Sequence, residues 1–532
     1  NGGPGAPFST ISQGVNVAED GDTVRVLAGT YLENLNLNGK SIAIVGYDSE
    51  TTILDGDSSG IVLTLNNSSS NSHVENVTIQ NGSGGVGTSN GAGIYCDGCT
   101  ATLKNLIVKD NVQDQSGDGS GIFSLGGSLT IDNIIVSDNE GAYGTVGLIN
   151  SNATLDNSNI INNTVSNNGG GLYVNSSDVS LRNSSVTNNS AGVGGGVFSN
   201  GSNLDIISSV VKENSSSDRA GGIAADGSTI LKISETLIHG NVSVGSGAGL
   251  ALTSSTTSIH NSTIANNTMT ELYAFGGGSL FHLFGNSSLT FFQSTLSNTQ
   301  PKIFRFEKNN ESDEINLSFH NSNVLGGQDS VATNETISEV GINFNWISSS
   351  NFDPDFIDED GADFNLLAYS KLINGGHPDS LDSDGTRADI GAFTYLNSYS
   401  GPDWYVSESG NDLSATGASE DPFRSIQAAL NFGSDNDTAF VSAGIYNENL
   451  VYRYDESESV RGVNLVGEDR DLTIIDAQDL SQGIILPSNG YSSVLIKNFT
   501  VQNGSGNGEL ASNNTYGGYG GGIMVGHNYE MV

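Results

Sequence analysis

The sequence predicts an all-β solenoid, a right-handed parallel β-helix, and two periodic patterns carry this prediction. The first is the frame apolar-x-Asn-x-x-apolar-x-x-Asn, in which equivalent positions recur at steps of 28, 24, 26, 25, 27 and 26 residues between Asn105 and Asn261. The second is Gly-x-Gly followed by an apolar pair, as at Gly171 and Gly196. A period of this size, with short runs of Val, Ile, Leu and Thr, is typical of stacked β-coils.

Two asparagine ladders are predicted from this frame. Asparagine suits a repeated turn because it tolerates left-handed backbone angles, and stacked amides can hydrogen-bond along the axis at the strand spacing of about 4.8 Å. The first ladder comprises Asn105, Asn133, Asn157, Asn183 and Asn261. The second comprises Asn111, Asn139, Asn163, Asn189, Asn214, Asn241 and Asn267.

A longer repeat divides the chain into units. The segment from Ala28 to Leu35, Ala-Gly-Thr-Tyr-Leu-Glu-Asn-Leu, returns from Ala443 to Leu450 as Ala-Gly-Ile-Tyr-Asn-Glu-Asn-Leu. A second, tandem β-helix unit is therefore expected to start near residue 402. The predicted parts are 1–60 (N-terminal cap and first coils), 61–330 (coils), 331–397 (acidic C-terminal cap), 398–403 (linker) and 404–532 (opening of the second unit).

Each unit is expected to begin with a short amphipathic helix that caps the solenoid, because a terminal coil otherwise exposes an unpaired strand edge. In the second unit, Ile426, Ala429 and Leu430 lie on one helical face, and Pro422 is placed in the first helical turn. The acidic segment 353–395 precedes this opening by a short linker. We therefore expect it to contact the region 404–430.

Composition excludes several function classes. The formal net charge is −41, with only 18 Lys and Arg residues, which argues against a nucleic-acid partner. No apolar run approaches 18 residues, so no membrane span is expected in this segment. The acidity suits an extracellular surface that repels itself and stays soluble.

The two cysteines are Cys96 and Cys99, at a predicted turn between two strands. A disulfide closing that turn is the favoured interpretation, and reduced thiols or a zinc site completed by two further ligands are the alternatives. Among many Asn-x-Ser/Thr sequences, Asn286 and Asn310 fall in expected loops. These two are the predicted glycosylation sites.

The acidic segment contains the one metal candidate. Asp382 and Asp384-Gly385 resemble the start of a calcium loop, and Asp389 lies nearby, so that oxygen ligands would suit Ca²⁺. A plain β-turn at Asp384-Gly385 is the alternative. No other cofactor is expected.

Aromatic and histidine side chains suggest surface features rather than a catalytic constellation. Tyr95, Phe123, Tyr173 and Phe198 follow the inward apolar residue of their coils, which predicts either an outward strip or, if the Gly bend shifts the register, an internal stack. His260 and His320 both precede a ladder asparagine and so share one outward strand position. No paired carboxylates, Gly-His-Gly or Arg-x-Lys arrangement marks a catalytic site.

Several motifs resemble a known superfamily. Tyr405-Val406-Ser407, Asp421-Pro422-Phe423 and Ala443-Gly444-Ile445-Tyr446 are similar to the opening of secreted right-handed parallel β-helix repeat proteins of the pectate-lyase-like superfamily. The segment ending in Asp384-Gly385-Thr386-Arg387-Ala388-Asp389 resembles the choice-of-anchor module of bacterial surface proteins. The resemblance implies the fold and export to a cell surface. It implies no single activity, because the superfamily includes lyases, hydrolases, esterases, adhesins and fibres.

We therefore expect an extracellular, non-catalytic structural or adhesive protein of tandem β-helix units, a component of a fibre or filament. Its expected partners are neighbouring units or further copies, with glycans or cell-surface polysaccharide as a second class. The competing hypotheses are a carbohydrate-active β-helix enzyme, either a polysaccharide lyase or a hydrolase, and a sugar-binding module.

Overall fold

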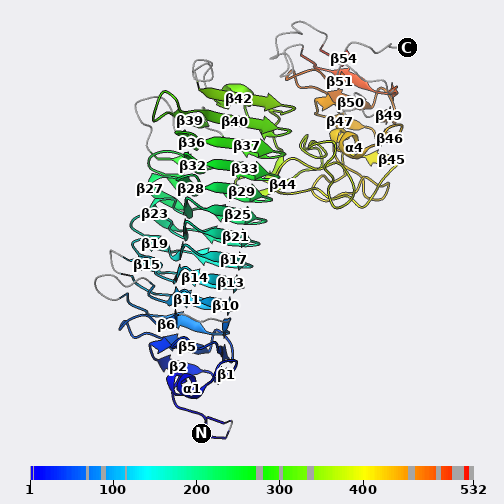
Figure 1. The fold of residues 1–532 in the computed structure, drawn as a ribbon. Coiled ribbons are helices and arrows are strands. Elements are labelled where there is room, and N and C mark those ends of the chain that lie inside the picture. The colour runs from blue at the N-terminus through cyan, green and yellow to red at the C-terminus, as the bar shows by residue number, and fades with distance from the viewer. Residues whose placement is uncertain are drawn as a thin grey trace. The chain divides into compact units, whose positions relative to one another are not determined.

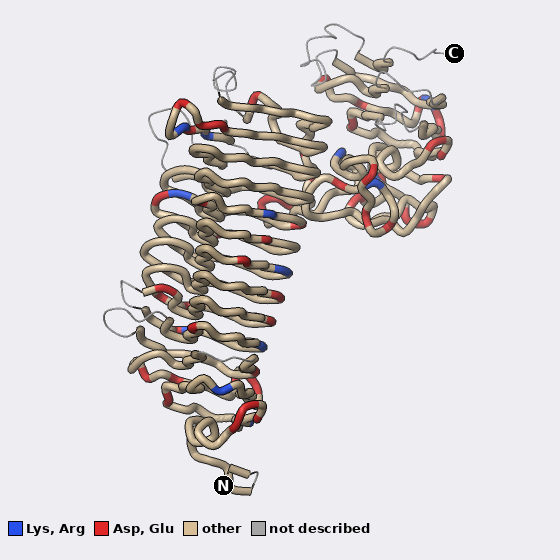
Figure 2. Tube along the Cα trace, viewed as in Figure 1, with Lys and Arg blue, Asp and Glu red and all other residues tan. Residues whose placement is uncertain are grey.

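The computed structural model describes residues 2–3, 5–66, 71–84, 91–113, 117–270, 280–298, 303–331, 341–452, 462–486, 493–505 and 521–525. It has two compact units, Asn1–Ser350 and Asn351–Val532. The predicted acidic segment 331–397 spans the boundary between them, and its part after Ser350 belongs to the second unit. Acidic residues outnumber basic ones along both units (Figure 2).

The first unit is a stack of coils in which each coil contributes one strand to each of three parallel sheets (Figure 1). We call them sheets A, B and C. In the described residues, sheet A has the order β1 (Thr23–Val26), β4 (Ala43–Gly46), β7 (Ser72–Glu75), β10 (Thr100–Lys104), β13 (Ser128–Asp132), β17 (Asn152–Asp156), β21 (Asp178–Arg182), β25 (Asn203–Ile207), β29 (Ile230–Ser234), β33 (Thr256–His260), β37 (Ser288–Phe292), β40 (Ile315–His320) and β42 (Ile342–Ile347).

Sheets B and C follow the same coil order. Sheet B contains β2 (Gly29–Leu32), β5 (Thr52–Asp55), β8 (Thr78–Gln80), β11 (Ile107–Lys109), β14 (Ile135–Ser137), β18 (Asn159–Ile161), β22 (Ser185–Thr187), β26 (Val210–Lys212), β30 (Leu237–His239), β34 (Thr263–Ala265), β38 (Thr295–Ser297) and β41 (Asn323–Val324). Sheet C contains β3 (Leu35–Asn36), β6 (Leu63–Asn66), β9 (Ile94–Asp97), β12 (Ile122–Leu125), β16 (Val146–Ile149), β20 (Leu172–Asn175), β24 (Val197–Asn200), β28 (Ile223–Asp226), β32 (Leu250–Thr253), β36 (Phe281–Phe284) and β39 (Phe304–Glu307).

A fourth, shorter sheet, which we call sheet D, was not predicted from the sequence. It is built from two- to five-residue strands in the turns between sheets B and C, namely β15 (Glu140–Gly141), β19 (Thr164–Val165), β23 (Ser190–Val193), β27 (Ser215–Arg219), β31 (Val242–Ser243) and β35 (Thr268–Met269). Its strands are too short to show an alternating pattern, so only the stacking of equivalent turns reveals them.

The core is a set of stacked rows, because strand side chains alternate between the two faces of each sheet. One row of sheet A passes through Leu155, Leu181 and Ile206, all of which are fully buried. At the last coils the row changes to aromatic side chains, where the rings of Phe291 and Phe319 stack 4.9 Å apart. The predicted all-β parallel solenoid is confirmed.

The predicted capping helices are present as α1 (Ile11–Val17) and α4 (Ile426–Phe432), while α2 (Gly327–Val331) follows β41. The expected place of Pro422 was wrong, since it precedes α4 by four residues. The helix start is held instead by a half-buried glutamate from the first coil. The Glu448 carboxylate accepts the N–H groups of Ile426 and Gln427, both at 2.8 Å.

The second unit has the same coil plan. Its parallel strands are β45 (Asp403–Val406), β46 (Thr438–Val441), β49 (Asn464–Gly467) and β52 (Ile496–Lys497) in one sheet, β47 (Gly444–Tyr446), β50 (Thr473–Asp476) and β53 (Thr500–Gln502) in another, and β48 (Leu450–Val451), β51 (Ile484–Leu486) and β54 (Ile523–Val525) in a third. An antiparallel pair, β43 (Phe356–Asp358) and β44 (Asp363–Leu366), precedes them.

The acidic segment packs on this second unit. Leu372 and Ile390 share one hydrophobic cluster with Trp404. The Ala368 N–H donates to the Asp412 carbonyl at 2.8 Å. The predicted contact between residues 353–395 and 404–430 is therefore confirmed, and it lies inside the second unit.

Candidate functional site

A buried asparagine ladder runs through the middle of the first unit. In each step one side-chain carbonyl accepts two bonds from the asparagine of the preceding coil. Thus Asn163 Oδ1 receives the backbone N–H and the side-chain Nδ2 of Asn139, each at 3.0 Å. The Asn163 Nδ2 in turn donates to Asn189 Oδ1 at 2.9 Å. The same pattern holds at every step from Asn111 to Asn267.

This ladder is almost completely removed from solvent, with each member at most 1% exposed. Each asparagine follows a residue in the left-handed backbone region, such as Asn162 with φ 58° or Asn188 with φ 55°. The kink turns the next side chain inward, where its amide bonds replace the missing water. The predicted ladder from Asn111 to Asn267 is confirmed, with amide hydrogen bonds at every step.

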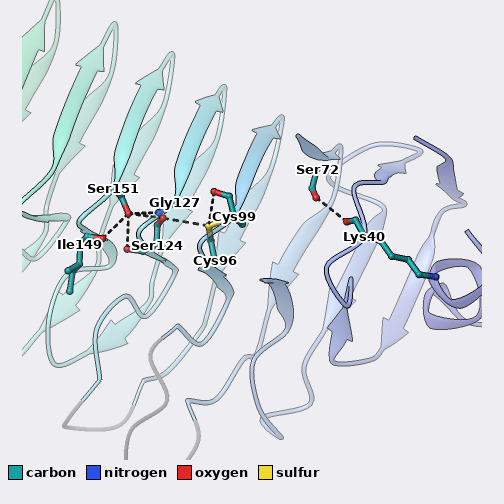
Figure 3. The surroundings of a disulfide bond; sticks show 8 residues. All are labelled: Lys40, Ser72, Cys96, Cys99, Ser124, Gly127, Ile149 and Ser151. Carbon is teal, nitrogen blue, oxygen red and sulfur yellow. Dashed lines mark hydrogen bonds between the residues drawn. A yellow bond between two sulfur atoms is a disulfide. The ribbon is translucent and has the colours of Figure 1, made fainter. Parts of the chain in front are cut away.

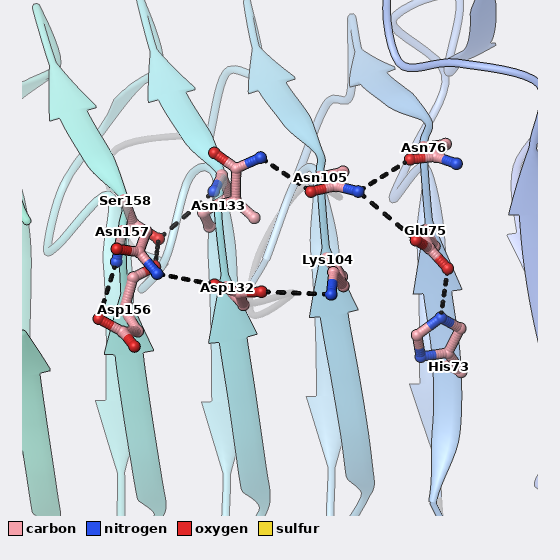
Figure 4. Close-up of polar contacts among 11 residues, drawn as sticks. His73, Glu75, Asn76, Lys104, Asn105, Asp132, Asn133, Asp156, Asn157 and Ser158 are labelled. Carbon is pink, nitrogen blue, oxygen red and sulfur yellow. Dashed lines mark hydrogen bonds and ion pairs between the residues drawn. The ribbon is translucent and has the colours of Figure 1, made fainter.

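The other predicted ladder lies at the outer corner between sheets A and B. Its members occupy the left-handed region, with φ 50° at Asn105 and 53° at Asn133. Asn133 Nδ2 donates to Asn105 Oδ1 at 2.8 Å, but the next amide, on Asn157, donates to the carboxylate of Asp132 at 3.2 Å (Figure 4). Asn183 likewise bonds Asp156, at 2.8 Å. The amides are thus one part of a mixed polar row.

The neighbouring outward row of sheet A carries charges that pair along the axis. Figure 4 shows Lys104 facing Asp132 of the next coil at 3.5 Å, whereas His73 bonds Glu75 of its own strand at 2.9 Å. Pairs of this kind on an exposed face contribute little stability. Each of these charged groups already has a partner on the same face, and it is not directed at a ligand.

Two ladders of hydroxyl groups were missed in the sequence. One ladder includes Ser158 and Ser184 of neighbouring coils, and the Ser158 N–H donates to Ser184 Oγ at 3.0 Å. The other links Ser151 to Ser177 at 2.9 Å. The signal was available, because Ser or Thr directly follows the left-handed residue of many coils, as in Asn183-Ser184 and Glu235-Thr236.

Cys96 and Cys99 form a disulfide bond, and both are buried in the core of the first unit. Cys96 lies in register with Ser124 of the next coil, whose hydroxyl approaches the Cys96 sulfur at 3.6 Å. The Ser124 and Ser151 hydroxyls are 3.0 Å apart (Figure 3). The cross-link therefore sits at one end of a hydroxyl ladder.

The four predicted aromatics point away from the coil interior but do not form an exposed strip. Tyr95 stacks on Phe123 at 5.8 Å, and Tyr173 stacks on Phe198 at 5.5 Å. Phe123 is fully buried, and Phe198 belongs to a small second core with Ala224. Val193 of sheet D packs against this small core, which explains why Phe198 is buried although it points outward. The outward direction is thus confirmed and the internal alternative is wrong, although the outward rings are largely covered.

A stack of solvent-facing rings does occur on sheet A. His260, Phe292 and His320 lie in register on neighbouring strands, with ring centroids 4.7 and 4.6 Å apart. The shared outward position of the two histidines is confirmed. Because the rings stack face to face along the axis, the middle ring presents its edge to solvent, which is not the face that a sugar ring stacks on.

A polar cluster lies beyond the outer face of sheet C. Ser246 Oγ is 2.9 Å from His282 Nδ1, and His282 Nε2 is 3.3 Å from Glu307 Oε2. Arg305 pairs with the same carboxylate at 3.0 Å. Burial, followed by the Arg305 charge, lowers the pKa of His282 to about 4. The imidazole is therefore neutral at pH 7, and the lowered pKa makes it a weak base.

This arrangement has the elements of a serine hydrolase site, but the hydroxyl is enclosed. Ser246 is only 7% exposed, and a nucleophile must reach its substrate. A second ion pair, Arg219 with Asp226 at 2.6 Å, lies on the same side of the coils. The cluster was not found by sequence reasoning, because its members come from three separate segments with no fixed spacing.

The predicted metal ligands act as acceptors for backbone N–H groups. Asp389 accepts from Asn374 at 2.6 Å and from Tyr395 at 2.7 Å. Asp382 accepts from Asp389, and Asp384 accepts from Thr386, each at 3.0 Å. Burial raises the pKa of Asp382. Among the described residues no three His, Cys, Asp or Glu side chains are grouped so that they could hold a metal ion. Calcium stays a prediction.

Asn286 and Asn310, the predicted glycosylation sites, are both exposed in loops at the end of the first unit. Asn286 Oδ1 accepts the Glu314 N–H at 2.9 Å. Their modification stays a prediction. Within the described ranges, no helix has the length and apolar character needed to span a bilayer.

The sequence model of one family, described as "Right handed beta helix region", matches residues 92–269. The solenoid is a right-handed parallel β-helix. No curated protein matches the chain.

Solved structures with a similar shape include pectate lyase Pel9A, with 16% identity, a TM-score of 0.41, and coverage of 73% of this chain and 92% of that one. A second is the PL6 family alginate lyase AlyGC, with 13% identity, a TM-score of 0.28, and coverage of 92% and 69%. A third is the PL6 family polysaccharide lyase Pedsa3628 from Pseudopedobacter saltans, with 10% identity, a TM-score of 0.30, and coverage of 72% and 97%. Values of this size carry no inference about activity.

Proposed function

We propose that this β-helix is a non-catalytic structural or adhesive protein, exported to the extracellular surface as part of a fibre or filament. The observation that supports this most is the buried ladder from Asn111 to Asn267. It uses seven consecutive coils to satisfy polar groups internally, and so it specifies the register of a long, regular stack. A scaffold needs this regularity along its whole length.

Export is supported by two features of the chain. The Cys96–Cys99 disulfide suits an oxidising compartment, since such bonds are rare in the cytosol. The net charge of −41 suits a surface that stays soluble at high local concentration. Asn286 and Asn310 would be accessible to glycosylation there.

Tandem organisation is supported by the way the acidic segment packs. Residues 353–395, which resemble the choice-of-anchor module, share a core with the opening of the second β-helix. We propose that such segments act as connectors, each covering the first coil of the unit that follows it. Neighbouring units and further copies would then be the principal partners, with surface polysaccharide as a second class.

Immunogold electron microscopy on thin sections of cells of the native source tests this proposal. Antibodies raised against the full chain should label the cell exterior, with gold particles aligned along filaments or spread over the envelope. Label confined to the cytoplasm would contradict both export and the structural role.

A carbohydrate-active enzyme is the second candidate, and the Ser246–His282–Glu307 cluster favours it. His282 is a neutral imidazole between the Ser246 hydroxyl and the Glu307 carboxylate, and Arg305 adds a positive charge beside them. Such a group could act on a glycan ester or uronate chain. Incubation with polyuronates and acetylated glycans, comparing the native chain with His282→Ala, separates the two candidates.

A further inference from the structure

Aspartate is followed directly by proline at two places, Asp353-Pro354 and Asp421-Pro422, both in the second unit. A peptide bond of this type can be broken from within the chain. The aspartate carboxylate attacks its own main-chain carbonyl, and the proline nitrogen leaves once it takes up a proton. The reaction requires that the carboxylate lies beside the bond that follows it. The two places differ in this respect.

At Asp353 the carboxylate lies on the side of the following peptide. Asp353 Oδ1 accepts the N–H of Asp355, two residues further along the chain, at 3.0 Å. This hydrogen bond closes a turn around Pro354, so the carboxylate reaches across the Asp353–Pro354 peptide. Asp353 is exposed, so water has access to the bond.

The residues after the bond are fixed in the second unit. Pro354 is buried, and its carbonyl accepts the Ser370 hydroxyl at 2.6 Å. The Asp355 carbonyl accepts the Leu367 N–H at 3.0 Å. Asp355 has a φ of 51°, in the left-handed region that aspartate tolerates. These contacts hold the turn in one conformation, which favours an intramolecular attack over a bimolecular one.

Asp355 also supplies an acid group next to the leaving nitrogen in the chain. Its carboxyl is half-buried, and burial, followed by the charge of Asp353, raises its pKa to about 7, while Lys371 opposes the shift. The titratable and charged groups around Asp355 and its neighbour Tyr369 are Asp353, Lys371, Asp412 and Glu448. A carboxyl of this kind is protonated at pH 5.5, and it loses its proton as the pH rises through about 7.

Asp421 lacks this arrangement. Its Oδ2 accepts the N–H of Thr416 at 2.9 Å and the Thr416 hydroxyl at 3.1 Å. The carboxylate is therefore directed toward residues that precede it, and not toward the peptide that follows it. The second residue after Asp421 is Phe423, which has no proton to donate. The Asp421–Pro422 bond is thus an internal control for the Asp353–Pro354 bond.

We propose that the chain cleaves itself at the Asp353–Pro354 bond. A carboxylate oxygen of Asp353 attacks the Asp353 main-chain carbonyl carbon and forms a cyclic anhydride. The carbon–nitrogen bond breaks, and the Pro354 nitrogen takes a proton from the Asp355 carboxyl. Water then opens the anhydride and returns a proton to Asp355. The net reaction is hydrolysis, which leaves Asp353 as a new C-terminus and Pro354 as a new N-terminus.

The cleaved bond lies shortly after Ser350, where the first unit ends. Cleavage leaves residues 354–395 joined to the unit whose opening they cover, because these residues share a core with that unit. The inference goes beyond the proposed structural role, since it states how a chain of tandem units is divided into separate units.

The test follows the purified full chain at pH 5.5 and pH 8, with protease inhibitors, by mass spectrometry of the intact protein. Products of residues 1–353 and 354–532 should form at pH 5.5, and the new N-terminus should read Pro-Asp-Phe-Ile-Asp. The rate should not depend on protein concentration. It should be about tenfold lower at pH 8, where roughly a tenth of a carboxyl with a pKa of about 7 is protonated.

Three variants assign the roles. Asp353→Ala removes the nucleophile and should abolish both products. Asp355→Asn removes the proton donor and should slow cleavage at pH 5.5 at least tenfold. Asp360→Asn changes an exposed carboxyl of the same segment, and it is the matched control that should cleave like the native chain. Circular dichroism checks that each variant keeps the β-structure of the native chain.

The proposal is overturned if the folded native chain gives no product at pH 5.5 over several days, or if Asp353→Ala is cleaved as fast as the native chain. It is also overturned if the Asp421–Pro422 bond is cleaved equally fast, because the reaction is then the general acid lability of such bonds. Cleavage of Asp355→Asn at the native rate and with the native pH dependence contradicts the role given to Asp355 and overturns the proposal as well.

Discussion

At the scale of single residues, two asparagine positions in each coil have different physical roles. Asn163 satisfies its side chain completely inside the stack, with Nδ2 also donating to the Val136 carbonyl at 2.9 Å. Asn157 lies at the outer corner, with φ 50° and an exposed amide that bonds Asp132. The first position needs the amide itself, whereas the second needs a residue that tolerates the left-handed region.

This difference predicts unequal effects of substitution. Asn163→Ala leaves buried donors and acceptors without partners in three coils, so the free energy of unfolding should fall by about 2–4 kcal/mol. Asn157→Gly keeps the backbone angle and loses one exposed bond, so the change should stay within about 1 kcal/mol. Urea denaturation of the full chain measures both. Equal losses would contradict the distinction.

A second prediction at this scale concerns two half-buried carboxyl groups of the second unit. Burial, followed by the charge of Asp353, raises the pKa of Asp355 to about 7, and Lys371 opposes the shift. Burial also raises the pKa of Glu448 to about 7. A carboxyl whose pKa is raised on folding stabilises the protonated folded form. The stability it provides is present below its ordinary pKa and is lost as pH rises through about 7.

Hydrogen exchange at the amides of α4 should therefore be slower at pH 5 than at pH 8, after correction for intrinsic rates. Asp355→Asn should reduce this pH dependence. The part that remains should come from Glu448, which still titrates in this variant. Asp360→Asn, an exposed position in the same segment, should leave it unchanged. If the pH dependence of exchange in α4 is identical in the native chain, Asp355→Asn and Asp360→Asn, Asp355 does not titrate as described.

At the scale of elements, the sequence predicted what is periodic and missed what is not. Sheets A to C and the ladder from Asn111 to Asn267 follow from a repeated frame, because each coil must bury equivalent apolar positions. Sheet D escaped detection because its strands are as short as two residues. The Ser246–His282–Glu307 cluster escaped because stacking, not spacing along the chain, brings its members together.

The capping glutamates give a prediction at the element scale. The Glu33 carboxylate also contacts the Ser12 hydroxyl, so it fixes the start of α1 to the first coil through three donors. Glu33→Ala should lower the local opening free energy of α1 by about 2 kcal/mol, which is a loss of protection of roughly thirtyfold.

The measurement is hydrogen exchange at Ile11–Val17, with Glu50→Ala as the control. Glu50 is exposed in the turn between β4 and β5, and its replacement should not alter α1. If Glu33→Ala leaves the exchange of α1 unchanged, the helix is held by its apolar contacts alone, and the role given to the glutamate is wrong.

At the scale of the whole molecule, polar groups along the coils are used by the coils themselves. Buried amides and hydroxyls bond from coil to coil, and outward charges such as Lys104 and Asp132 pair along the axis. Within the described ranges, the cluster around His282 is the arrangement that most closely approaches a reactive site, and its serine is enclosed. These features support our proposal that the chain is a scaffold.

The most direct test of this central claim is an activity measurement on the full chain. The protein is incubated with polygalacturonate, alginate and acetylated glycans, with and without calcium, and unsaturated ends, reducing ends and released acetate are measured. The account predicts no product above that of a heat-denatured sample. Product formation by the native chain that is lost in His282→Ala would contradict the account and identify the His282 cluster as an active site.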